Sequence, residues 1–186
     1  EGPANNNNGM IAFNPTTLPT WNTIGLTGLT GSGAMDYTGF NPQSGAPTTL
    51  YAQDTFGSGG LYSINDQTGA ATLIAPNVQG VDDFAYNPTD GHMYGISSSA
   101  LYQFNLNTGA ATFMGTYNIG GLETGPGFAS DGRAFIQDLI TDTIYVAAPG
   151  SFVATPLYTL PFDANFSQGL FVDWSAGDRG YYGALN

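Results

Sequence analysis

Four acidic side chains could bind a cation together if the fold brings them to one point. They are Asp36, Asp82, Asp83 and Glu123, and each precedes or begins a short segment rich in aromatic and β-branched residues. Carboxylate oxygens are the ligands that calcium prefers, whereas carboxylates gathered without a cation repel one another and raise one another's pKa. Each acid could instead cap a tight turn by accepting backbone N–H bonds. Their spacing matches no calcium loop, so both a calcium site and a set of turn caps stay open.

Catalytic motifs are missing from the rest of the sequence. His92 is the single histidine and directly follows the turn signal Asp90-Gly91, so we expect a solvated turn residue. The chain has no phosphate loop, HExxH motif or EF-hand spacing, and with no cysteine it has no thiol chemistry. We therefore expect no enzymatic activity and no cofactor other than the calcium considered above.

Two tryptophans and the first residues are candidates for contacts with other molecules. Trp21 and Trp174 could stack on a sugar, contact a neighbouring subunit or lie in the core. The segment 1–9 is rich in asparagine and should be mobile unless it docks on a neighbouring subunit, which we favour, or on its own domain. The predicted subunit contact consists of Glu1, Pro3, Asn5, Asn6, Asn7, Asn8, Trp21 and Trp174.

Charge limits the possible partners. The 186 residues include 2 Lys and Arg residues in total against 14 Asp and Glu, a formal net charge of −12. Such a surface cannot neutralise phosphates, so we expect neither nucleic acid nor membrane insertion, while a glycan remains a possible ligand. Low charge and abundant Gly, Thr and Asn favour a secreted protein at the cell surface, where Asn165 would match a glycosylation motif.

A repeat indicates which elements must position these residues. "LYSINDQTGAATLI" begins at Leu61 and returns as "LYQFNLNTGAATFM" at Leu101, 40 residues later. Two aromatic and β-branched runs lie between the copies and flank a Pro-Thr-Asp-Gly turn signal, which predicts a β-hairpin. Each copy predicts a second hairpin around its Thr-Gly, so one repeat corresponds to four strands.

The remaining sequence fits the same template. We expect eight hairpins and no competing helix, because no long window keeps helical periodicity. They are residues 10–25, 35–53, 61–74, 81–97, 101–114, 125–138, 144–158 and 169–185. We expect a tail over residues 1–9 and a single all-β domain over residues 10–186.

The pattern "DFAYNPTDGHMYGIS…LYQFNLNTGAAT" resembles the WD-repeat-like and related bacterial β-propellers. The resemblance implies four blades of four antiparallel strands, with the "DFAYN" strand innermost and the "TGAAT" strand outermost. The chain would then begin with an outer hairpin and end with an inner one. These two hairpins could close the fourth blade within the chain, or pair with those of neighbouring subunits.

These features favour an extracellular structural protein that assembles with itself into a filament or surface layer. The alternative is a secreted adhesin that binds a glycan or peptide, and it requires exposed aromatic side chains beside the central channel. A metal-dependent hydrolase or lyase using the four acids is the least favoured.

Overall fold

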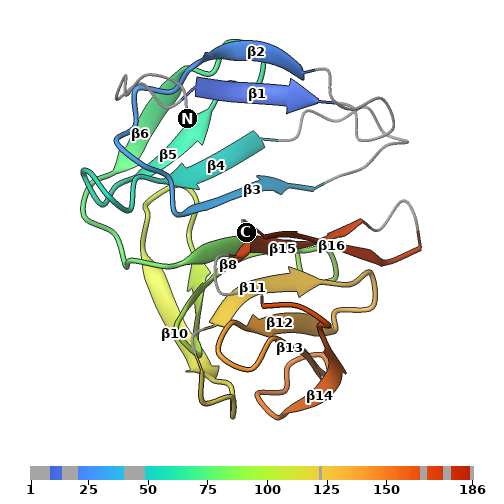
Figure 1. Cartoon of the computed structure of the whole chain (residues 1–186). Coiled ribbons are helices and arrows are strands. Elements are labelled where there is room, and N and C mark those ends of the chain that lie inside the picture. Colours follow the sequence, from blue (N-terminus) through green and yellow to red (C-terminus); the bar gives the residue numbers. More distant parts are fainter. Residues whose placement is uncertain are drawn as a thin grey trace.

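The computed structural model describes residues 9–13, 21–39, 49–121, 123–163, 167–173 and 177–184. These residues form sixteen β-strands in five antiparallel sheets (Figure 1). Within these ranges, no helix has the length and apolar character needed to cross a membrane. The prediction of an all-β chain is confirmed.

Three of the sheets have four strands each, and strands that follow one another in the chain are neighbours in the sheet. The first sheet contains β3 (Ala34–Thr38), β4 (Thr49–Gln53), β5 (Leu61–Ile64) and β6 (Ala71–Ala75). The second contains β7 (Asp83–Asn87), β8 (His92–Ser97), β9 (Ala100–Phe104) and β10 (Ala111–Thr116). The third contains β11 (Glu123–Phe128), β12 (Ala134–Asp138), β13 (Thr143–Ala147) and β14 (Ala154–Thr159).

The two other sheets are single hairpins at the two ends of the described chain. One pairs β1 (Gly9–Phe13) with β2 (Trp21–Leu26), and the other pairs β15 (Ser167–Asp173) with β16 (Arg179–Ala184). All eight hairpins predicted from the sequence are therefore present.

The residues that the two sequence repeats share form the same kind of turn in each repeat. The side-chain oxygen of Asn65 accepts N–H bonds from Gln67 and Thr68, and Gly69 closes the turn onto the carbonyl of Asn65 with φ 77°. In the second repeat Asn105 does the same, and Gly109 has φ 72°. Glycine takes this left-handed conformation without the penalty of a Cβ, which explains why Asn and Thr-Gly recur.

The first strands of successive units lie side by side. β3 adjoins β7, β7 adjoins β11, and β11 adjoins β15. We call the first two strands of a sheet its inner pair and the last two its outer pair. The "DFAYN" strand is β7, which contacts both β3 and β11; its predicted innermost position in a propeller blade stays a prediction.

Apolar clusters hold the four-stranded sheets together. Between the first and second sheets, Leu61, Val81, Met93 and Phe104 are buried in one cluster. A second cluster joins the second and third sheets, where the rings of Tyr94 and Phe128 lie 5.3 Å apart. Each large buried side chain contributes roughly 1.5–3 kcal/mol.

Repeated four-stranded sheets with adjoining first strands are consistent with a propeller-like repeat. The described residues contain three complete sheets and no closed ring, so four closed blades are not confirmed. The proposed division into a tail over residues 1–9 and a domain over residues 10–186 stays a prediction, because residues 1–8 lie outside the described ranges.

Candidate functional site

A cavity of about 380 Å³ lies among the inner strands β3, β7, β11 and β15. We call it the inner-strand cavity. Its lining includes the acids Asp36, Asp83 and Asp173 together with aromatic residues from all four strands. The volume is within the range of about 300–1,000 Å³ that is typical of small-molecule sites.

The carboxylate of Asp36 links the first and second sheets. Its Oδ1 accepts the N–H of Tyr37 at 2.7 Å, and its Oδ2 accepts the N–H of Tyr86 at 2.7 Å. Tyr86 belongs to β7, an edge strand of the second sheet. Asp36 therefore connects the first sheet to a backbone donor on the edge of the second.

Asp83 links the second sheet to both units that follow it. Its side chain is 8% exposed, its Oδ1 accepts the N–H of Phe84 at 2.9 Å, and it accepts backbone N–H bonds from Leu170 and Gly125. A Cβ at Gly169 would lie 3.1 Å from Asp83 Oδ2, and the φ of Gly169 is 148°. Only glycine fits this conformation so close to a carboxylate without strain.

Burial raises the pKa of both acids. The pKa of Asp36 rises to about 6 because burial outweighs the hydrogen bonds from Tyr86 and Tyr37. For Asp83, burial raises the pKa well above its ordinary value against the Phe84 hydrogen bond, and the negative charge of Asp36 raises it further. The cavity thus holds two interacting carboxyl groups in a poorly solvated setting.

The other two acids predicted to converge have different positions. Asp82 Oδ2 accepts the N–H of Ser98 at 2.9 Å in the turn between β8 and β9, so it acts as a turn cap. Glu123 begins β11, but its side chain lies outside the described side chains. Among the described residues, no group of three or more His, Asp or Glu side chains is placed to hold a metal ion. The four-residue calcium site stays a prediction.

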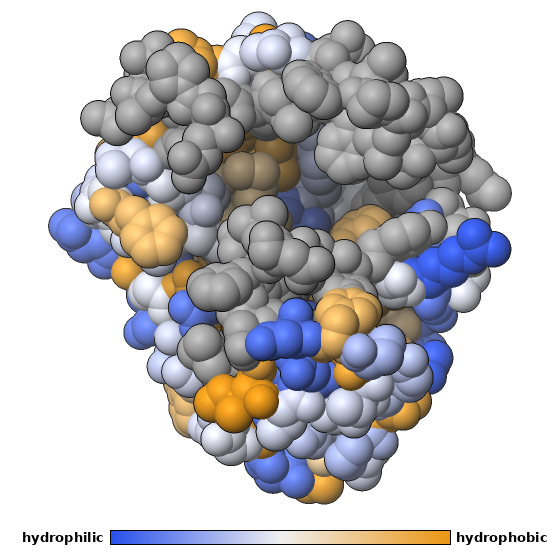
Figure 2. Space-filling view, viewed as in Figure 1, coloured by the Kyte–Doolittle hydropathy of each residue, from blue (hydrophilic) through white to orange (hydrophobic). Residues whose placement is uncertain are grey.

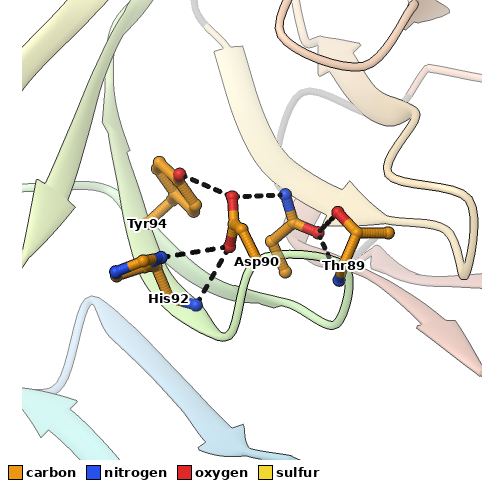
Figure 3. Close-up of polar contacts among 5 residues, drawn as sticks. Thr89, Asp90, His92 and Tyr94 are labelled. Atoms are coloured by element: carbon orange, nitrogen blue, oxygen red, sulfur yellow. Dashed lines mark hydrogen bonds and ion pairs between the residues drawn. The ribbon is translucent and has the colours of Figure 1, made fainter.

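His92 belongs to a polar cluster in the turn between β7 and β8 (Figure 3). Asp90 accepts hydrogen bonds from the Tyr94 hydroxyl at 2.8 Å, from Asn87 Nδ2 at 3.1 Å and from the His92 N–H at 3.0 Å. His92 Nδ1 lies 3.4 Å from Asp90 Oδ1, and half of the histidine side chain, 51%, is exposed. This arrangement stabilises the turn and agrees with the predicted solvated histidine.

Exposed aromatic side chains stand beside the inner-strand cavity. Tyr37 is 38% exposed and Phe171 is 54% exposed, and both line it. An exposed aromatic group at the inner strands is the feature that a ligand-binding protein requires and a purely structural subunit does not.

The remaining predicted contact residues cannot be placed. Residues 1–8 and Trp174 lie outside the described residues, as does Asn165, and Trp21 is described only as part of strand β2.

Some residues that position the site were missed in the sequence analysis. Gln53 is fully buried, and its amide donates to the Gln79 carbonyl and accepts the Val81 N–H, which fixes the entry of the chain into β7. The signal was the dipeptide Gln-Asp, which recurs at 53–54 and at 137–138. Gly169 and Phe171 gave no signal, because neither lies in a repeated motif.

Comparison with known proteins yields a likeness of fold. No protein family model matches the chain, and no curated protein shows significant similarity to it. A solved protein of unknown function from Bacteroides thetaiotaomicron is similar, with a TM-score of 0.50 and 17% sequence identity. The match covers 73% of this chain and 35% of that one, so this chain spans about a third of that protein's length. It supports the repeated all-β fold.

Proposed function

We propose that this protein is an extracellular structural subunit that polymerises by strand addition into a filament or surface layer. In this proposal the fold is a propeller of four blades, and the fourth blade is shared by two copies. The inner pair β15–β16 of one copy joins the outer pair β1–β2 of the next. The observation that carries the proposal is that the described chain has three four-stranded sheets and, at its two ends, two separate two-stranded sheets, which could complement each other as halves of one sheet.

The hairpin β1–β2 has the structure of an outer pair. Every outer pair has a register shift at the same point, next to the pairings Leu61 with Ala75, Leu101 with Gly115, and Ile144 with Tyr158. In β1–β2 the shift follows the equivalent pairing of Met10 with Gly25.

The hairpin β1–β2 also packs like an outer pair. Gly25 lies against the carbonyl of Thr68 in the turn between β5 and β6, where a side chain would collide. One unit further on, Ala75 lies against Gly109 in the turn between β9 and β10. Between the second and third sheets, Gly115 lies against the ring of Phe152, in the loop between β13 and β14. These similar contacts support the assignment of β1–β2 as the outer half of a blade that precedes the first sheet.

The hairpin β15–β16 has the structure of an inner pair. β15 adjoins β11 as β11 adjoins β7. Ser130, in the turn between β11 and β12, donates its N–H and hydroxyl to Asp178 in the turn between β15 and β16, at 2.8 and 2.9 Å. An aromatic residue also recurs at one position of every second strand, as Tyr51, Tyr94, Phe135 and Tyr181.

In the described chain the two halves do not pair with each other. In the complete sheets the second strand pairs with the third, so β16 and β1 each have one edge without a partner among the described residues. Backbone donors and acceptors on an open edge are a template for another chain. In the coloured part of the face seen in Figure 2, hydrophobic residues are dispersed among hydrophilic ones.

The complete sheets also give the register of the shared blade. Tyr51 pairs with Ser63, Tyr94 with Gln103 and Phe135 with Val146. By equivalence Tyr181 of one copy should pair with Ala12 of the next, Gly180 with Phe13, and Gly183 with Met10. Because the surfaces that meet differ, the contact is heterologous and propagates unless the rotation closes a ring.

Electron microscopy of truncated proteins tests the assembly. Full-length protein should form filaments or sheets, and a variant lacking residues 1–13 should remain dispersed because strand β1 is gone. A variant lacking only residues 1–8 is the matched control and reports separately on the predicted tail contact. Dispersed monomers of the full-length protein at all concentrations, or polymers that survive removal of β1, would contradict the proposal.

A further inference from the structure

The inner-strand cavity has a chemistry that polymerisation through strand edges does not use. Its walls combine carboxyl groups with rings of Tyr37 and Phe171 that are partly open to solvent. We infer that this cavity binds a small organic cation, with the cationic group facing Asp36 and Asp83 and the apolar body against Tyr37 and Phe171.

The charge of the cavity lining favours a cationic ligand. Among the described side chains that line the cavity, none is basic. Arg133 lies outside the cavity lining, where it pairs with Asp131 at 2.7 Å and stacks over Phe135 at 5.6 Å. A bound ammonium group would find carboxylates and aromatic faces, which attract cations more strongly where water is excluded.

Hydrogen bonding favours an organic cation over a metal ion. Both oxygens of Asp36 already accept backbone N–H bonds, and Asp83 accepts three. Calcium needs six to eight oxygen ligands, whereas an ammonium group needs only the remaining lone pairs and a ring face. Among the described residues no cluster suited to a metal is present.

Binding of such a cation should release protons. The titratable groups that line the cavity are Asp36 and Tyr37 from β3, Asp83 and Tyr86 from β7, and Asp173 from β15. Two of these groups have a raised pKa. The pKa of Asp36 rises to about 6, and the pKa of Asp83 also lies well above its ordinary value. A cation favours their ionised forms, so its affinity should fall as the pH is lowered from 7.5 to 5.

Calorimetric titration with benzylammonium tests the inference, with benzyl alcohol as the neutral probe of similar shape. Benzylammonium should bind at one site per chain at least tenfold more tightly than benzyl alcohol, and should bind more weakly at pH 5. Phe171→Ala, which leaves both carboxyl groups in place, should weaken binding several-fold. Asp83→Asn should weaken it at least tenfold.

Asp163→Asn is the matched control, because it removes one negative charge at an exposed position outside the cavity lining. Its affinity for benzylammonium should equal that of the unaltered protein. Equal affinity for the two probes, or a Phe171→Ala variant that binds as tightly as the parent, would overturn the inference. Binding of a methyl glycoside in place of benzylammonium would also overturn it and would assign the cavity to a glycan.

Discussion

The Asp36 carboxylate accepts the N–H of Tyr86 at 2.7 Å, although 50 residues separate the two in the chain. This hydrogen bond joins the inner strands of two successive sheets. β3 and β7 are edge strands of their sheets, so a backbone N–H on the outer side of such a strand needs an acceptor from outside its own sheet. An acidic side chain from the neighbouring unit is one way to satisfy this N–H, at the cost of burying a carboxylate.

That cost predicts a specific dependence of stability on pH. Burial raises the pKa of Asp36 from its ordinary value of 3.8 to about 6 in the folded protein, so the folded state holds this proton more tightly than the unfolded state. The free energy of unfolding should therefore decrease as the pH rises from 4 to 6, by up to about 1.4 kcal/mol per pH unit from this group. Above the pKa that Asp36 has in the folded protein, its contribution to the free energy of unfolding no longer changes with pH.

The variant Asp36→Asn isolates this effect. Urea unfolding of both proteins at several pH values should show a smaller decrease between pH 4 and 6 for the variant. Identical slopes for the two proteins would show that Asp36 is not buried as described.

Asn105→Ala should destabilise the protein by about 0.5–1.5 kcal/mol, because the exposed N–H groups of Asn107 and Thr108 exchange their side-chain acceptor for water. Asn107→Ala is the control at a neighbouring position in the same turn. Equal midpoints of urea unfolding for the two variants would be inconsistent with the role given to Asn105.

Gly169→Ala should destabilise the protein by about 1–3 kcal/mol, because alanine is strained at φ 148° and its Cβ would lie 3.1 Å from Asp83. Gly120→Ala is the matched control, since nothing lies within 4 Å of a Cβ there. Thermal unfolding measures the difference. A Gly169→Ala variant as stable as Gly120→Ala would contradict the close approach of Gly169 to Asp83.

Tyr94→Phe should cost about 1 kcal/mol through loss of the hydrogen bond to Asp90. Burial and this hydrogen bond raise the pKa of Tyr94 to about 12, so ultraviolet titration of the parent should show a tyrosine that ionises late. The step that belongs to Tyr94 should be lost in the variant, whereas the ionisation of Tyr117, whose pKa burial also raises, should remain. His92→Ala, at an exposed position, should change stability little.

The strand pattern could be predicted because it depends on local chemistry. Turn residues such as Asn65 and Gly69 act within their own hairpin, and their recurrence marks each repeat. The position of Asp83 relative to Gly169 could not be predicted, because it depends on how units 86 residues apart pack. Of the acids expected to converge, Asp36 and Asp83 share a cavity, whereas Asp82 caps the turn between β8 and β9. The sequence shows that an acid begins a strand, but the way the sheets pack determines where its side chain points.

Disulfide cross-linking tests the shared blade most directly, because the chain has no cysteine of its own. Ala12→Cys and Tyr181→Cys are made as separate variants and mixed under oxidising conditions. Directly opposite strand residues lie about 4.5–5.5 Å apart at Cα, within disulfide range, whereas residues two out of register lie about 7–8 Å apart. Strand exchange predicts disulfide-linked dimers in this mixture and few when Met10→Cys replaces Ala12→Cys. No dimer in the mixture, together with an intrachain disulfide in the double variant, would show that each chain closes on itself.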